Sequence, residues 1–344
     1  MRIAVVTSSP PMAEGGHMVI ARSLRQALRD AGHDADIIVT PQNRFGRQAS
    51  AYVATWFTDV GVADGHGIDR VISLRYPSYA VRHEQHVCWL NHTMREYYDL
   101  WDRFSATLGS RGLMKERLRR AAIHATDRYL LGRNVRQLFV QSRTIQQRLV
   151  MWPEIRSTVL YPPAPQRSYR CDNYGDFIFM VSRLTALKRA HLLIEALTTP
   201  HGRGIKAVIA GAGEDMSALQ ALVTVRNLSD RVRLVGRLDD DGLVDHLARC
   251  RAVCFPPLQE DYGFVTVEAF ASRKAVVTCV DSGGPAELVT DAVNGFVCDP
   301  TPESIAVALR RLMDDAPLAE RLGAAAFARG AELNWPDAVR RLTA

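Results

Sequence analysis

Short apolar runs alternate with longer amphipathic stretches along the chain. The first run, Arg2–Thr7, is followed by a helical pattern from about Met18 to Ala31 and by a second apolar run at Asp36–Thr40. A strand, a helix and a second strand in this order typify an open parallel sheet with helices on both faces. Further strands of the same sheet are expected at 70–74, 86–90 and 137–141.

The pattern restarts after Leu160–Pro165, where three prolines favour an extended, irregular segment. The strands expected beyond it are near-continuous apolar runs, as in sheets covered on both faces: Asp176–Val181, Lys206–Ala210, Val232–Val235, a run beginning at Ala252, and Ala275–Cys279. The predicted fold class is therefore α/β, with two Rossmann-like, doubly wound parallel-sheet domains that face a cleft.

Breaks in the pattern of strands and helices indicate the domain boundaries. We expect a first domain at 1–165 and a second at 166–330. The last stretch, 331–344, is a short amphipathic helix that carries Trp335 and is too small to be a domain. It is expected to pack back against the first domain.

The composition is typical of a folded protein without membrane-spanning helices. The 344 residues are 47% hydrophobic and 23% charged, the balance of a folded chain. No apolar run approaches the roughly 18 residues of a spanning helix, and the first residues lack a basic start followed by an apolar block. The six cysteines are scattered in apolar surroundings without a CxxC pair. We expect a cytoplasmic enzyme.

The net charge of +6 does not specify a nucleic-acid partner, and none is expected. The cations cluster in the amphipathic stretch Arg111–Arg120, which also carries Leu113, Met114 and Leu118. A basic amphipathic helix can rest on anionic lipid, which would put the protein at the inner face of a membrane. The alternative is the solvated face of a packed helix.

Candidate chemistry lies in the loops that follow the strands of the second domain, where open parallel sheets bind ligands. Arg183 and Lys188 bracket the predicted start of a helix, and two cations so placed suit a diphosphate. Two ordinary surface cations would give the same pattern. Gly211 and Gly213 form half of a dinucleotide fingerprint, but Met216 stands in place of its third glycine.

The next loop carries two carboxylates, Glu260 before an apolar helix and Glu268 about one turn into it. A facing acid and nucleophile would indicate a glycosidase, but this spacing does not predict a facing pair. Two carboxylates can instead accept hydrogen bonds from separate hydroxyl groups of one long ligand. The following Gly283-Gly284-Pro285 turn allows close approach of the backbone and a proline at the first helical position.

Taken together in order, these motifs resemble the donor domain of the family-4 retaining glycosyltransferases of the GT-B fold. The matching segments are Ser182-Arg183-Leu-x-x-x-Lys188, Gly211-x-Gly213, Val235-Gly236-Arg237, Glu260-x7-Glu268 and Gly283-Gly-Pro-Ala-Glu287. In the first half, Gly15-Gly16 and the segment from His92 through Arg95 to Asp99 are similar to the same family. The resemblance is loose through residues 40–85.

The resemblance implies a transfer of a hexose-type sugar from a nucleotide-diphosphate sugar to an acceptor hydroxyl, in glycan, glycolipid or glycosylated-metabolite biosynthesis. It implies that Arg183 and Lys188 bind the diphosphate, Glu260 the sugar and Glu268 the ribose, and that His92 contacts the sugar near the reacting carbon. The implied catalytic residues are His92, Arg183, Lys188 and Glu260. The implied donor-binding residues are Gly15, Gly16, Arg183, Lys188, Gly213, Arg237, Glu260, Gly263, Phe264, Val265, Thr266 and Glu268. Acceptor-binding candidates are Arg95 and Tyr98.

No metal or cofactor is expected besides the nucleotide sugar. Asp239-Asp240-Asp241 contains a DxD pattern, but it precedes an apolar helix, so one of these residues is expected to cap that helix. The alternatives left open are an epimerase or hydrolase of nucleotide sugars with the same fold, a NAD-dependent oxidoreductase, and a sugar-nucleotide sensor without catalysis. The residues do not separate UDP, GDP and ADP, and they leave the sugar, the acceptor and the oligomeric state open.

Overall fold

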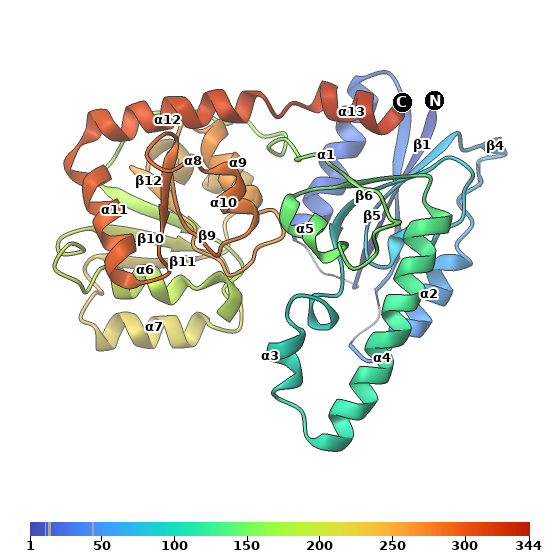
Figure 1. Cartoon of the computed structure of the whole chain (residues 1–344). Helices are drawn as coiled ribbons and strands as arrows, with labels where there is room; N and C mark the ends of the chain where they lie inside the picture. The colour runs from blue at the N-terminus through green and yellow to red at the C-terminus, as the bar shows by residue number, and fades with distance from the viewer. Residues whose placement is uncertain (11, 13–14, 43–44) are drawn as a thin grey trace. The chain divides into compact units, whose positions relative to one another are not determined.

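The computed structural model describes residues 1–10, 12, 15–42 and 45–344, and it is an α/β fold with two parallel six-stranded sheets (Figure 1). The chain divides into two compact units. Unit 1 comprises 1–162 with 335–344, and unit 2 comprises 163–334. The boundaries expected from the sequence were 165/166 and 330/331.

The sheet of unit 1 has the strand order β2-β1-β5-β6-β7-β8, with every pairing parallel. Its strands are β1 (Arg2–Ser9), β2 (Asp34–Pro41), β5 (Arg70–Arg75), β6 (His86–His92), β7 (Gln137–Val140) and β8 (Thr158–Val159). A separate antiparallel pair, β3 (Val62–Ala63) with β4 (His66–Gly67), lies within residues 40–85, where the family resemblance is loose. The central strands are buried on both faces: Val5 and Val6, successive residues of β1 that point to opposite faces, have no exposed surface.

The α-helices of unit 1 are α1 (Gly16–Asp30), α2 (Gln48–Trp56), α3 (Trp101–Ser105), α4 (Ser110–Tyr129), α5 (Arg143–Arg148) and α13 (Trp335–Thr343). Figure 1 shows the connection between α3 and α4 projecting away from the sheet. The basic stretch noted in the sequence is thus the first half of α4.

The last helix, α13, belongs to unit 1. The Trp335 ring packs edge-on against the Trp89 ring of β6, with 6.2 Å between their centroids. Arg70 Nη1 donates hydrogen bonds to the carbonyls of Leu342 (3.0 Å) and Ala344 (2.7 Å), near the end of the helix. Val339 and Leu342 are buried. The prediction that the final helix packs back on the first domain is confirmed.

Unit 2 repeats the architecture with strand order β11-β10-β9-β12-β13-β14, again all parallel. Its strands are β9 (Phe177–Val181), β10 (Lys206–Ala210), β11 (Val232–Gly236), β12 (Ala252–Cys254), β13 (Val276–Cys279) and β14 (Gly295–Cys298). Its helices are α6 (Ala190–Ala196), α7 (Met216–Val225), α8 (Asp240–Arg249), α9 (Phe264–Ala271), α10 (Gly284–Leu288), α11 (Pro302–Asp314) and α12 (Ala316–Ala331). Figure 1 shows α7 and α12 on opposite faces of this sheet, so the predicted α/β class with two doubly wound parallel sheets is confirmed.

Among the described helices, none combines the length and the apolar character needed to cross a lipid bilayer.

Candidate functional site

The site candidates of unit 2 gather at one edge of its sheet. Because all six strands are parallel, the loops that leave their carboxyl ends lie along the same edge. The loops that carry candidate residues are 182–189 after β9, 211–215 after β10, 237–239 after β11, 255–263 after β12 and 280–283 after β13.

The loop after β9 brings Lys188 against a carboxylate. Lys188 ends a short 3-10 turn, and its Nζ lies 2.5 Å from Glu260 Oε2 in the loop after β12. Only 20% of the Lys188 side chain and 17% of the Glu260 side chain are exposed. Arg183 lies in the same loop with its side chain exposed, and it forms no ion pair within the described part of the chain. Cation and carboxylate are thus adjacent at this edge.

Arg189 is a residue that the sequence interpretation missed. It adopts the left-handed backbone conformation (φ 51°), and its guanidinium donates 2.7 Å hydrogen bonds to the carbonyls of Pro256 and Pro257. It also forms a 2.6 Å ion pair with Asp281. Arg189 therefore ties the loops after β9, β12 and β13 together. The only signal in the sequence was the cation next to Lys188.

The two glycines of the partial fingerprint serve the packing of neighbouring loops. A Cβ at Gly213 would lie 2.0 Å from the carbonyl oxygen of Leu184, and one at Gly211 would lie 1.8 Å from that of Ser182. Because these atoms belong to the backbone, a side chain at either glycine would displace the loop after β9. This requirement accounts for both glycines without a ligand.

The backbone around Glu260 is held by hydrogen bonds to the next loop. The Glu260 amide donates to Ser282 O, and the Gly284 amide donates to Glu260 O, both at 2.9 Å. Gly283 (φ 68°) allows this approach, since a Cβ there would lie 2.5 Å from Glu260 O. Gly263 (φ 81°) is equally restricted, with a Cβ placed 2.9 Å from the Phe255 ring. The position of Glu260 is therefore fixed by backbone contacts.

Helix α9 begins directly after Gly263, and its first amides have no partner within the helix. These are the amides of Phe264 and Val265, since the Thr266 amide bonds to Gly263 O at 3.0 Å. The side chain of Thr266 is fully buried. Amides at the start of a helix suit an anion or a hydroxyl oxygen.

Glu268 lies about one turn into α9 and is only 6% exposed. Burial raises the pKa of its carboxyl above the ordinary value, while the Arg167 charge and a hydrogen bond from Tyr169 lower it. Arg167 Nη1 donates to Glu268 Oε1, and the Tyr169 hydroxyl lies 3.2 Å from the same oxygen. Both donors come from the segment before β9, which the sequence interpretation did not single out.

The aspartates after β11 have structural partners. Asp239 caps α8 by accepting a 2.8 Å hydrogen bond from the Gly242 amide, as expected for this position. Asp240 lies 2.9 Å from Arg167 Nε. Arg237, just before them, is exposed. Within the described ranges, no three or more His, Cys, Asp or Glu side chains are grouped as metal ligands would be.

The candidates of unit 1 lie at the carboxyl edge of its sheet. Gly15 is the N-cap of α1 and Gly16 its first residue, while residues 11, 13 and 14 of the same loop lie outside the described residues. His17 Nε2 lies 3.0 Å from the Ser9 hydroxyl. His92 is the last residue of β6 and pairs in register with Arg75 of β5.

The two acceptor-binding candidates are turned into unit 1. Arg95 is 7% exposed and donates to Asp99 Oδ2 at 2.7 Å. Tyr98 is 6% exposed, and its hydroxyl donates to Asp127 Oδ2 at 2.6 Å. The structure therefore gives both side chains internal partners.

Comparison with known proteins finds a family match within unit 2. The family described as Glycosyl transferases group 1 matches residues 167–329. Among curated proteins, an alpha-D-kanosaminyltransferase from Streptomyces kanamyceticus is 34% identical over 42% of this chain and 38% of its own length. A human alpha-1,3/1,6-mannosyltransferase is 26% identical over 55% of this chain and 49% of its own. A D-inositol 3-phosphate glycosyltransferase from Streptomyces griseus is 30% identical over 44% of this chain and 30% of its own. The chain spans between about a third and a half of the length of these relatives.

Solved structures share the whole fold at low sequence identity. Sucrose-phosphate synthase from Thermosynechococcus elongatus superposes with a TM-score of 0.78 at 17% identity, covering 99% of this chain and 98% of its own. HepE from Anabaena in complex with UDP-glucose superposes with a TM-score of 0.71 at 18% identity, covering 99% and 98%. WaaG, a glycosyltransferase involved in lipopolysaccharide biosynthesis, superposes with a TM-score of 0.72 at 16% identity, covering 98% of this chain and 99% of its own. These likenesses concern the fold.

Proposed function

Because the chain belongs to the GT-B glycosyltransferases, with its group 1 domain at residues 167–329, we propose that it transfers a sugar from a nucleotide-diphosphate sugar to an acceptor hydroxyl. The configuration at the anomeric carbon is retained. The nucleotide binds at the carboxyl edge of the unit 2 sheet. HepE, a structural neighbour, was solved in complex with UDP-glucose, which supports a donor of this class.

The contact between Lys188 and Glu260 carries the proposal. During transfer, the bond between the anomeric carbon and the diphosphate oxygen breaks, so positive charge grows on the sugar and negative charge on the departing phosphate. A cation and a carboxylate 2.5 Å apart, both largely withdrawn from water, offer one group for each developing charge. Lys188 stabilises the diphosphate, and Glu260 accepts hydrogen bonds from the sugar hydroxyls.

The other groups proposed to bind the donor lie at the same edge of the unit 2 sheet. Arg183 adds a second cation in the Lys188 loop, the amides of Phe264 and Val265 begin α9, and Glu268 accepts hydrogen bonds from the ribose. These groups offset the charge of the leaving diphosphate with protein alone, so no divalent metal is required. As the new bond to the anomeric carbon forms, a departing phosphate oxygen takes the proton of the acceptor hydroxyl.

The substitution Lys188→Ala tests the leaving-group role. It should lower turnover about 10²–10³-fold, the usual cost of removing one group that stabilises transition-state charge. The donor is first chosen by thermal shift from UDP, GDP and ADP sugars, because a ligand that binds the native state stabilises it. Release of the nucleoside diphosphate and of free sugar is then measured with and without acceptor.

A matched control is Lys206→Ala, which removes an exposed lysine at the opposite, amino end of β10. This variant should keep wild-type turnover. Near-normal turnover of the Lys188→Ala variant would contradict the role proposed for Lys188. If free sugar is released at the same rate with and without acceptor, the reaction is hydrolysis and not transfer.

The proposal also includes a contact between helix α4 and a membrane surface. The outward face of α4 carries Arg111, Met114, Lys115 and Leu118, one helical turn apart and all exposed. Met114 is 60% and Leu118 68% exposed. Cations beside exposed apolar side chains suit an anionic lipid surface, so we propose that this α4 face contacts such a surface.

A further inference from the structure

Arg167 connects carboxylates on two helices of unit 2. Its Nη1 donates a hydrogen bond to Glu268 in α9, and its Nε lies 2.9 Å from Asp240 at the start of α8. The side chains of Arg167 and Glu268 are 12% and 7% exposed, whereas Asp240 is exposed. Removing one member of such a buried pair leaves the other charge without compensation, so the two residues depend strongly on each other.

The two oxygens of Glu268 have different surroundings. Arg167 and Tyr169 both donate to Oε1. Oε2 accepts no hydrogen bond from any residue that the structure describes. Because both donors hold the same oxygen, they set the orientation of the carboxylate and leave its other oxygen to a ligand.

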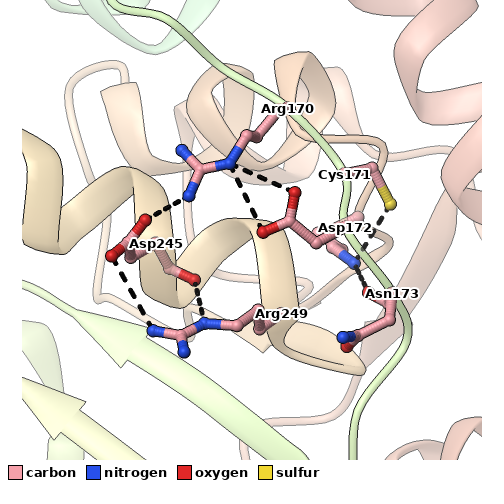
Figure 2. A network of polar contacts seen from close by, with 7 residues as sticks. Arg170, Cys171, Asp172, Asn173, Asp245 and Arg249 are labelled. Carbon is pink, nitrogen blue, oxygen red and sulfur yellow. Dashed lines mark hydrogen bonds and ion pairs between the residues drawn. The ribbon is translucent and has the colours of Figure 1, made fainter.

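The segment that carries Arg167 is itself anchored (Figure 2). Arg170 forms ion pairs with Asp172, at 3.1 Å, and with Asp245 of α8. The fully buried Lys274 donates to Cys171 Sγ at 3.3 Å and to the carbonyl of Asn173. The backbone that positions Arg167 is therefore attached to α8 and to the core of unit 2 before any ligand binds.

The charge state of Glu268 depends on the same partners. The titratable groups that act on it are Arg167 and Tyr169, from the segment before β9, and Asp240, from α8. Burial raises the pKa of Glu268, Arg167 and Tyr169 lower it, and the Asp240 carboxylate raises it. Without the Arg167 charge the carboxyl would bind a proton at a higher pH, and a protonated carboxyl is a weaker hydrogen-bond acceptor.

We propose that Arg167 is a positioning residue for the ribose of the nucleotide: it holds Oε1 of Glu268 so that Oε2 accepts the ribose hydroxyls as an ionised group. This role rests on the proposed function, because it takes Glu268 as the ribose contact. Arg167 acts through Glu268, and no contact of its own with the diphosphate is required.

The experiment compares ribonucleotides with nucleotides that lack the ribose hydroxyls. Affinities of UDP, GDP and ADP and of their 2′,3′-dideoxy counterparts are measured by calorimetry for wild type and Arg167→Gln. We expect wild type to prefer one ribonucleotide over its dideoxy counterpart by about tenfold or more, since buried polar groups reject a ligand that leaves them unpaired. Arg167→Gln should lose most of this preference, with dideoxynucleotide affinity changed less than about threefold.

A pH series distinguishes positioning from a purely structural role. Because loss of the Arg167 charge raises the pKa of Glu268 further, ribonucleotide affinity of Arg167→Gln should rise with pH as Glu268 ionises. Glu268→Gln should show no such rise, and Arg167→Lys should recover part of the wild-type preference because it restores the charge. Arg329→Gln is the matched control, since Arg329 pairs with Glu332 at the end of α12 and touches neither Glu268 nor the segment that carries Arg167. It should behave as wild type.

Three outcomes would overturn the proposal. An Arg167→Gln variant that keeps the full ribose preference would refute the role of Arg167 alone. Equal losses for ribonucleotide and dideoxynucleotide would assign Arg167 to the stability of unit 2 or to the phosphates. Wild type that binds none of the three nucleotides would refute the proposed function, and the role of Arg167 with it. Thermal unfolding of each variant, with Arg167→Lys as the milder change, shows that the measured proteins are folded.

Discussion

Asp127 illustrates how single residues of unit 1 are set by their neighbours. It lies in α4 without exposed surface, and its carboxylate accepts hydrogen bonds from the hydroxyls of Tyr52, Tyr79 and Tyr98. Burial raises the pKa of Asp127 to about 6, although the three tyrosine hydrogen bonds lower it. The folded protein therefore binds this proton more tightly than the unfolded chain, whose carboxyl has the ordinary value of 3.8.

This difference predicts a pH dependence of stability. Between about pH 4 and about pH 6 the folded state holds more protons on Asp127, so the free energy of unfolding falls as the pH rises. The free energy of unfolding falls by at most about 3 kcal/mol, because each unit of pKa difference between the folded and unfolded states corresponds to roughly 1.4 kcal/mol. The Asp127→Asn variant should not show this fall. Urea unfolding of both proteins from about pH 4 to about pH 7 measures the difference, and parallel pH profiles would contradict the prediction.

The residues of the candidate site were only partly predictable. Lys188, Glu260 and Glu268 could be proposed because each follows a predicted strand, and such loops share one edge of a parallel sheet. The contact of Arg167 with Glu268 joins positions 101 residues apart, and no local pattern contains it. The same holds for Arg189, whose partners lie in two other loops.

At the scale of elements, long apolar runs were predicted well and short or edge elements were not. Strand β10 matches its expected bounds, and β9 differs by one residue. The two-residue strand β8 and the edge strand β14 were not predicted, because few residues carry their pattern and the pairing with β7 or β13 defines them. Helix α4 continues to Tyr129, well past the basic stretch that was noted in the sequence.

The α4 face is tested by membrane binding. Replacing both cations, Arg111→Gln with Lys115→Gln, should weaken binding to phosphatidylglycerol-containing vesicles about tenfold or more, since each cation near an anionic surface contributes about 1 kcal/mol. Co-sedimentation measures the binding. The control is Arg128→Gln, which removes an exposed α4 arginine paired with Glu154. Equal binding to neutral phosphatidylcholine vesicles would contradict an electrostatic contact.

At the scale of the whole molecule, unit 1 is built from two separate stretches of chain. Leu342 of α13 has no exposed surface, and Arg70 of β5 donates to its carbonyl. Two sheets could be predicted because the apolar pattern restarts after the prolines at 162–165. The bounds of α13 depend on contacts with unit 1, which the sequence pattern does not contain.

Truncating Leu342 should destabilise unit 1 selectively. Leu342→Ala leaves a cavity in the packing of α13 and should cost about 2–5 kcal/mol. Hydrogen exchange followed by mass spectrometry should show faster exchange in residues 1–162 and little change in 163–334. The exposed Arg340→Ala is the control. Uniformly faster exchange in both units would show that they unfold together.

The split of unit 1 has a consequence for how the protein is made. The ribosome must add all of residues 163–334 after Pro162 before the helix that completes the first unit exists. During that interval the surfaces of β6 and β7 that later meet Trp335 and Arg341 lack their cover. Nascent unit 1 therefore keeps these surfaces uncovered until synthesis passes residue 343, whereas unit 2 has its whole sequence available before then.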